Sequence, residues 1–135
     1  MFTVKQYFKS RFTAGFFYFR NMDVDFLRKV CLSLPAVTED IKWDNLVFSL
    51  GERMFCMMPL EQPFKCSFKV SDEEFEQVSL TDGFMPAPYL ARAKWVLVTK
   101  PSKLSKNEWE RYLKQSYELV KLKLTKKRRE QLGIQ

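Results

Sequence analysis

Apolar side chains recur along residues 23–34 at the three- and four-residue spacing of an amphipathic helix. The apolar face consists of Leu27, Val30, Cys31 and Leu34. An acidic residue is a common N-cap, and proline cannot continue a helix. We therefore predict a first helix that starts at Asp23 and stops at Pro35.

The middle of the chain contains short apolar segments bounded by turn residues, which is the pattern of strands. The predicted strands are residues 39–43, 45–50, 53–58, 64–70 and 94–99. Gly51 and Glu52 separate the second and third segments, so we predict a hairpin with a two-residue turn. In residues 64–70, apolar and polar side chains alternate, which indicates a strand with one face in the core and one in water.

Two later helices are predicted from their first residues. Ser71 and Glu74 have the spacing of a capping box, in which two side chains satisfy backbone N–H groups at a helix start. Ser105 and Glu108 repeat this spacing. The first of these helices is short and ends near Gly83. The second is longer, and its predicted buried stripe consists of Leu113, Ser116, Tyr117, Val120 and Leu124.

The order of these elements is helix, strands, short helix, strand and long helix. Strands grouped between helices argue for an α+β fold, with an antiparallel sheet of about five strands and the helices packed on one face. With 135 residues, of which 46% are hydrophobic, the chain suits one domain. No apolar run approaches the ~20 residues that span a bilayer, so we expect no membrane span. We also expect a monomer.

Composition removes several function classes. Histidine, the commonest general base near neutral pH and the commonest zinc ligand, is absent. Cys31, Cys56 and Cys66 are widely spaced, which favours buried, reduced thiols in a cytoplasmic protein over disulfides or a thiolate metal site. We therefore predict no catalytic residues, no cofactor and no metal, and do not expect an enzyme.

The net charge of +7 is concentrated at the two ends of the chain. Residues 1–21 carry +4 and residues 121–135 carry +5, which leaves −2 for residues 22–120. Solvated tails and contact with phosphates both explain such basic ends. The candidate nucleic-acid contacts are Lys65, Lys69, Arg92, Lys94, Lys126, Lys127, Arg128 and Arg129.

Residues 1–21 differ from the rest in lacking acids and in being rich in phenylalanine. No small-residue cleavage site follows their apolar core, so a signal peptide fits poorly. We interpret them as an N-terminal extension upstream of a natural start at Met22. The alternative is a basic amphipathic segment that lies on a membrane surface. Residues 22–135 form the single predicted domain.

The segment PAPYLARAKWVLV, residues 86–98, combines prolines, aromatic rings and cations. We predict that Tyr89 and Trp95 pack in the core between sheet and helices, while Arg92 and Lys94 remain outside. If the two rings are exposed instead, they would suit the anchors of a protein-binding surface. Their solvent exposure therefore separates the two interpretations.

Four parts of the chain, taken in order, resemble the MmcQ/YjbR family. They are CLSLPAVTED (31–40), GERMFCMM (51–58), PAPYLARAKWVLV (86–98) and SYELVKLKL (116–124). The residues that carry the resemblance are Leu34 and Pro35, Gly51 and Phe55, Trp95 and Val96, and Ser116 and Tyr117. The similarity extends over residues 22 to about 130.

This resemblance implies a CyaY-like, that is frataxin-like, fold and a DNA-binding protein of the double-wing type. Such a protein would contact phosphates non-specifically through surface lysines and arginines. The alternative is a protein-interaction adaptor that neither binds nucleic acid nor catalyses a reaction. Fold alone does not decide between them.

A frataxin-like fold also raises the question of iron, which oxygen ligands bind. The dense acidic cluster of the sequence consists of Asp72, Glu73, Glu74 and Glu76. These acids occupy the first turns of a predicted helix, where the helix dipole favours negative charge. We therefore assign them a structural role.

Overall fold

The computed structural model describes residues 18–61 and 63–135, with side chains from Val24 onward. Residues 1–17 of the predicted extension lie outside the described part, and the natural start at Met22 stays a prediction. Helix α2 (Tyr18–Leu32) begins before the predicted N-cap, so the assignment of Asp23 as N-cap is wrong. The residues just before Asp23 include no proline or glycine that would stop the helix from extending upstream.

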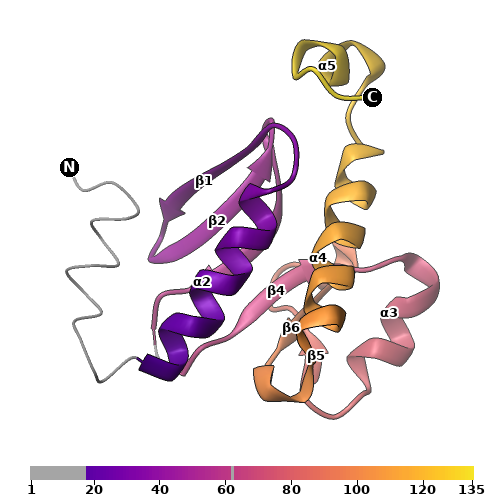
Figure 1. Ribbon diagram of the computed structural model, residues 1–135. Coiled ribbons are helices and arrows are strands. Elements are labelled where there is room, and N and C mark those ends of the chain that lie inside the picture. Colours follow the sequence, from indigo (N-terminus) through magenta and orange to yellow (C-terminus); the bar gives the residue numbers. More distant parts are fainter. Residues whose placement is uncertain (1–17, 62) are drawn as a thin grey trace.

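The strands form one antiparallel sheet in the order β1-β2-β3-β4-β6-β5 (Figure 1). The strands are β1 (Val37–Lys42), β2 (Asn45–Leu50), β3 (Arg53–Pro59), β4 (Cys66–Lys69), β5 (Phe84–Pro86) and β6 (Trp95–Val98). The other helices are α3 (Asp72–Ser79), α4 (Lys106–Lys121) and α5 (Lys126–Gln131), with single 3-10 turns η1 (Ala91–Ala93) and η2 (Pro101–Lys103). The predicted α+β fold is confirmed, with β5 as a strand that was not predicted.

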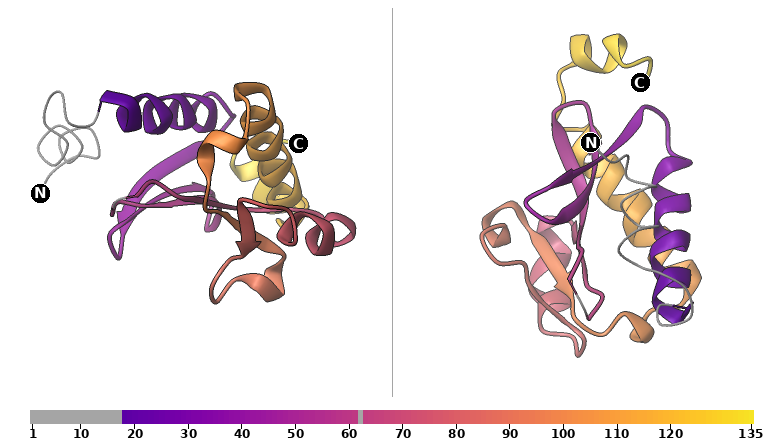
Figure 2. Two further views of the ribbon diagram at one scale, coloured as in Figure 1. Left: turned by 90° about the horizontal axis from the view of Figure 1, so that it is seen from below. Right: turned by 90° about the vertical axis from the view of Figure 1, so that its left-hand side faces the viewer.

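Helices α2 and α4 pack on one face of the sheet and enclose the main core (Figure 2, left). Its largest fully buried side chains include Phe48, Phe55, Phe68, Leu27 and Leu113. The residues of the predicted stripe are all buried, from Leu113 to Leu124. Helix α4 ends at Lys121, however, so Leu124 lies beyond the helix that was predicted to include it. Within residues 18–61 and 63–135, no helix combines the length and the apolar composition that a membrane crossing requires.

A second, smaller core covers the opposite face of the sheet near β6. Val96 and Val98 belong to the main core, so the alternating neighbours Trp95 and Leu97 point to the other side. The loop of residues 87–94 lies over them there (Figure 2, left). Trp95 is therefore buried, as predicted, but beneath this loop and not between sheet and helices.

The prediction that one face of residues 64–70 lies in water is wrong at Ser67. Ser67 pairs with Leu97 across the two strands and is only 2% exposed, although the alternation placed it on a wet face. Lys65 and Lys69, on the same face of the strand, are only partly exposed. A period of two residues identifies the two faces of a strand but does not show whether another segment covers the second face.

Two hairpins connect the first three strands. Gly51 and Glu52 form the predicted turn between β2 and β3, and Gly51 has a φ of 62°. Trp43 and Asp44 join β1 to β2 with φ angles of 50° and 61°, the sign that a type I′ turn requires at both positions. Trp43 was predicted to end a strand, but it lies in this turn and is 90% exposed.

Both predicted helix starts are confirmed. Ser105 accepts a bond from the N–H of Glu108 at 3.2 Å, and the Glu108 carboxylate accepts from the N–H of Ser105 at 3.0 Å. Ser71 likewise accepts from the N–H of Glu74 at 3.2 Å. The Glu74 carboxylate, however, accepts from the Ser71 hydroxyl and from the side-chain amide of Gln115, so it links α3 to α4.

Candidate nucleic-acid interface

Lys69, Lys94 and Lys123 come from separate parts of the chain and lie close together. Lys69 ends β4, Lys94 precedes β6 and Lys123 follows α4. The Lys69 ammonium donates to the backbone carbonyl of Ala93, next to Lys94. The Lys94 ammonium lies 5.1 Å from the centre of the Phe75 ring. Pairing of β4 with β6 and packing of α4 across the sheet bring the three cations to one region.

The electrostatics of this region are those of a crowded positive surface. The pKa of Lys69 is lowered from its ordinary value, first by partial burial and then by repulsion from Lys123, with a smaller contribution from Lys94. Asp72 acts in the opposite direction. Burial and like charges both disfavour a charged ammonium. A bound anion would offset this repulsion.

Lys123 also connects this region to the end of α4. It lines one shallow hollow together with Lys69, Asp72 and Glu73, and a second hollow with Arg53 and Lys127. The first hollow contains two acids beside two lysines, whereas the second contains one acid, Glu52, beside four cations, so positive charge dominates in the second hollow. We refer to the following residues as the basic surface: Arg53, Lys69, Lys94, Lys123 and Lys127.

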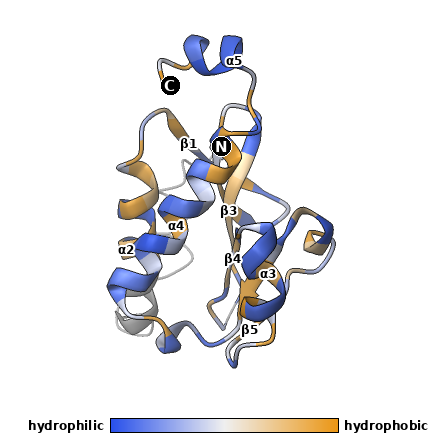
Figure 3. Ribbon diagram, turned by 90° about the vertical axis from the view of Figure 1, so that its right-hand side faces the viewer, coloured by the Kyte–Doolittle hydropathy of each residue, from blue (hydrophilic) through white to orange (hydrophobic). Residues whose placement is uncertain are grey.

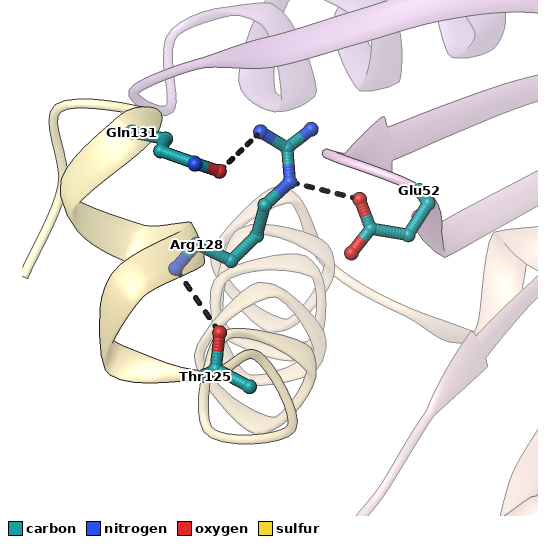
Figure 4. A network of polar contacts seen from close by, with 4 residues as sticks. All are labelled: Glu52, Thr125, Arg128 and Gln131. Atoms are coloured by element: carbon teal, nitrogen blue, oxygen red, sulfur yellow. Dashed lines mark hydrogen bonds and ion pairs between the residues drawn. The ribbon is translucent and has the colours of Figure 1, made fainter.

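Arg128 has a structural partner at the β2–β3 turn (Figure 4). Its Nε donates to Glu52 at 2.9 Å, and one terminal nitrogen donates to Gln131 at 3.4 Å. Its backbone N–H donates to the hydroxyl of Thr125, the N-cap of α5. The hydrogen bond from the Arg128 guanidinium to Glu52 also lowers the pKa of the Glu52 carboxyl. The guanidinium thus holds α5 against the hairpin.

The remaining predicted contacts, Arg129, Lys126, Lys65 and Arg92, lie in different surroundings. Arg129 donates to the backbone carbonyl of Leu124 at 3.2 Å, which also anchors α5. Lys126 is exposed on α5, which Figure 3 draws mostly in the blue of hydrophilic residues. Lys65 lies four positions from Lys69, roughly 13 Å along the strand direction. Arg92 is exposed in η1, within the loop that covers Trp95.

Of the eight predicted contacts, the structure therefore brings together Lys69, Lys94 and Lys127. Sequence reasoning missed Arg53 and Lys123 as members of this surface. Lys123 was counted only in the charge of the C-terminal end, and Arg53 only as the first residue of a strand. Their proximity depends on how α4 crosses β3 and β4, which no local pattern records.

Tyr89 contradicts the prediction that it packs in the core. Its side chain is 104% exposed, whereas that of Trp95 is 4% exposed. Tyr89 has a φ of 66° in the loop of residues 87–94, while its neighbours Ala87 and Leu90 pack inward against the second core. The positive φ turns the ring away from the sheet. This conformation is not predictable from the residue type, because tyrosine rarely adopts it.

The thiols are free and buried, as predicted. The sulfur atoms of Cys56 and Cys66 are 3.6 Å apart, and Cys31 is also fully buried. Burial raises the pKa of Cys31 and of Cys66, which disfavours their thiolates. Burial also opposes a charged Cys56, but hydrogen bonds with Cys31 and Cys66 lower the pKa of Cys56 to about 5. Cys56 is 0% exposed, so its sulfur is not accessible from solvent. In the described part of the chain, no group of three or more acidic or thiol side chains is arranged to hold a metal ion.

Comparisons with known proteins agree with this architecture. The crystal structure of protein DR2400 from Deinococcus radiodurans, with the domain DUF419, has a TM-score of 0.73 and 31% identity over 83% of this chain and 88% of that chain. A Pseudomonas syringae protein has a TM-score of 0.58 over 74% and 97% of the two chains, and its 18% identity supports the fold alone. A search of curated proteins finds no match. The family model of YjbR matches residues 32–119, and the chain therefore belongs to the YjbR family.

Proposed function

We propose that the chain binds nucleic acid through the basic surface and contacts phosphates without reading base sequence. The observation that carries this proposal is the convergence of Lys69, Lys94 and Lys123 from three elements. Like charges held together in this way cost free energy, which a polyanion recovers by neutralising them. The net charge of +7 favours the same class of ligand.

Lysine suits this role because its ammonium donates to phosphate oxygens regardless of the neighbouring base. The acids at the margin, Asp72 and Glu73, limit the surface on the side of α3. Glu52 is paired with Arg128, so its charge is offset on the side of α5. We therefore expect binding of modest affinity with a strong dependence on salt. We further propose that the protein acts by binding and not by catalysis, because its thiols are buried.

The test is a fluorescence-anisotropy titration of labelled DNA with the full chain at several salt concentrations. A variant with Lys69→Gln, Lys94→Gln and Lys123→Gln removes three charges from the basic surface. A matched control, Lys29→Gln, Lys42→Gln and Lys106→Gln, removes three charges elsewhere. Each phosphate contact that is lost lowers the slope of log affinity against log salt by ~0.9 for duplex DNA.

We expect the first variant to weaken binding and reduce the salt slope, while the control changes both much less. An equal loss in the two variants would assign binding to net charge and remove the surface from the proposal. No saturable binding by the unmodified chain at low salt would overturn nucleic-acid binding altogether. Circular dichroism of each variant verifies that the fold is retained.

The second candidate function is a protein-interaction adaptor. It is favoured by the exposure of Trp43 and Tyr89, because exposed aromatic rings are frequent anchors of protein interfaces. A purified partner whose affinity falls when either ring is replaced by alanine, together with no DNA binding at low salt, would support the adaptor.

A further inference from the structure

Tyr89 is a large aromatic residue that is held in a left-handed conformation with its ring in solvent. Its φ is 66° and its side chain is 104% exposed. The left-handed region is unfavourable for residues with a Cβ atom, and glycine or asparagine would relieve the strain. Burial in the core does not explain the ring, since the ring lies outside it. A strained residue with an exposed aromatic side chain is a candidate for a functional contact.

The loop presents this ring on a well-supported backbone. The N–H of Ala87 donates to the carbonyl of Trp95 at 3.0 Å, and the N–H of Trp95 donates to the carbonyl of Leu90 at 3.2 Å. Ala87 is 1% exposed and Leu90 packs on the second core. The Lys69 ammonium holds the far side of the loop through the carbonyl of Ala93. Because the backbone is already ordered, little conformational entropy is lost when the ring binds a ligand.

The part of the sequence that contains Tyr89 carries charge of one sign. Between residues 83 and 107 the chain contains no acid, and Arg92 and Lys94 lie in the same loop as Tyr89. Arg92 is exposed three positions after the ring, and Lys94 belongs to the basic surface. A ligand that suits this loop therefore combines negative charge with flat apolar faces.

Single-stranded nucleic acid has both properties, because its phosphates are anionic and its unpaired bases expose their faces. In a duplex the bases are already stacked on one another, so an isolated surface ring has no base face to cover. We infer that the loop of residues 87–94 binds single-stranded nucleic acid, with a base stacked on Tyr89 and the adjacent phosphates beside Arg92 and Lys94. This inference rests on the proposed function and names the form of nucleic acid that the site prefers.

The experiment compares three labelled oligonucleotides of equal length with the full chain: oligothymidylate, the same backbone with abasic sites, and a duplex. The abasic strand retains the phosphates but offers no base to stack. Since stacking of one base contributes on the order of a 5- to 150-fold change in affinity, we expect oligothymidylate to bind that much more tightly than the abasic strand. The duplex should also bind more weakly than oligothymidylate.

Variants locate the effect at one ring. Tyr89→Ala should lower the affinity for oligothymidylate to the affinity for the abasic strand, and it should leave the affinity for the abasic strand unchanged. Tyr89→Phe and Tyr89→Trp keep an aromatic ring, so they should still bind oligothymidylate more tightly than the abasic strand. Trp43→Ala is the matched control, because it removes another exposed ring from a turn with positive φ. It should not change the affinity for any of the three oligonucleotides. In a Trp43→Phe background, emission from Tyr89→Trp should be quenched by oligothymidylate and not by the abasic strand.

Different results would overturn stacking on Tyr89 and nucleic-acid binding as such. Equal binding of oligothymidylate and the abasic strand, or tighter binding of the duplex, would overturn stacking on Tyr89 while nucleic-acid binding stands. An equal effect of Trp43→Ala and Tyr89→Ala would also overturn it. Absence of binding to all three oligonucleotides would overturn both proposals and favour a protein partner for the ring.

Discussion

The phenol of Tyr117 donates a hydrogen bond of 2.7 Å to the backbone carbonyl of Pro35, a residue 82 positions earlier in the chain. Tyr117 lies on α4 and Pro35 lies between α2 and β1. The bond therefore fixes the last long helix to the first connection of the domain. Two of the sequence pairs that resemble the family, Leu34 with Pro35 and Ser116 with Tyr117, meet at this point.

We expect Tyr117→Phe to lower the free energy of unfolding by about 1 kcal/mol, the typical net value of one hydrogen bond. Urea denaturation followed by fluorescence measures this change. Tyr112→Phe is the control, because Tyr112 is buried on the same helix but forms no hydrogen bond through its hydroxyl in the described residues. Equal destabilisation by the two variants would show that the bond to Pro35 contributes nothing specific.

Ser116 joins two strands through one buried hydroxyl. It donates to the carbonyl of Phe55 on β3 at 2.6 Å and accepts from the N–H of Lys69 on β4 at 2.9 Å. Ser116→Ala leaves both groups without this partner, so we expect a loss of about 1–3 kcal/mol in the free energy of unfolding. Ser67→Ala, at a serine that is also buried, should lower the free energy of unfolding by less than Ser116→Ala does. A small effect at both serines would contradict the prediction.

Arg28 and Glu39 connect α2 to β1 through two hydrogen bonds, at 3.0 and 2.6 Å. The hydrogen bonding that Arg28 donates to the Glu39 carboxylate is the main reason that the pKa of Arg28 is raised. The side chains are only 21% and 18% exposed, so solvent screens the pair less than a surface pair. A double-mutant cycle with alanine at both positions should give a coupling of about 1 kcal/mol.

The control cycle uses Glu110 and Lys114, an exposed pair at 3.4 Å on α4. Exposed pairs at this helical spacing typically couple by about 0.3–0.5 kcal/mol. A coupling between Arg28 and Glu39 that does not exceed the control value would mean that the bidentate geometry adds no stability.

Asp82 lies between two ammonium groups, those of Lys100 and Lys103, each at 2.9 Å. Their hydrogen bonds lower the pKa of the Asp82 carboxyl to about 2. Because the folded-state pKa lies below the ordinary value, these contacts stabilise the fold above pH ~4, and this contribution is lost as the pH falls through about 2. Titration of the Asp82 carboxyl carbon by NMR measures the midpoint.

The double variant Lys100→Gln and Lys103→Gln should return the midpoint of Asp82 toward ~4. A wild-type midpoint already near that value would show that the two lysines do not pair with the carboxylate in solution. An equal midpoint in wild type and in the double variant would also show that the two lysines do not pair with the Asp82 carboxylate.

Local signals made several elements predictable. The starts at Ser71 and Ser105 were identified because a cap depends on a side chain and an N–H only three positions apart. The turn at Gly51 was identified because glycine readily adopts positive φ. The start of α2 was not, because Asp23 resembles a cap although no proline or glycine lies between Tyr18 and Asp23. Strand β5 was missed because three residues that end in Pro86 give no periodic pattern.

The candidate site was less predictable because it depends on packing between distant elements. The alternation in β4 is the same whether its second face is wet or covered, so the burial of Ser67 could not be foreseen. Tyr89 and Trp95 are both aromatic residues in one segment, and only the backbone conformation of Tyr89 separates their environments. Lys123 joins Lys69 only once α4 lies across the sheet.

The strand order has a consequence for the folding pathway. Strands β1, β2 and β3 follow one another through two-residue turns, whereas α3 and β5 lie in the chain between Lys69 of β4 and its partner Trp95 of β6. Closing a longer loop costs more chain entropy, so we expect the β1–β3 meander to assemble first and the β4–β6 pairing to complete the sheet late. The loop that carries Tyr89 connects β5 to β6, so the presentation of this ring would be among the last events of folding.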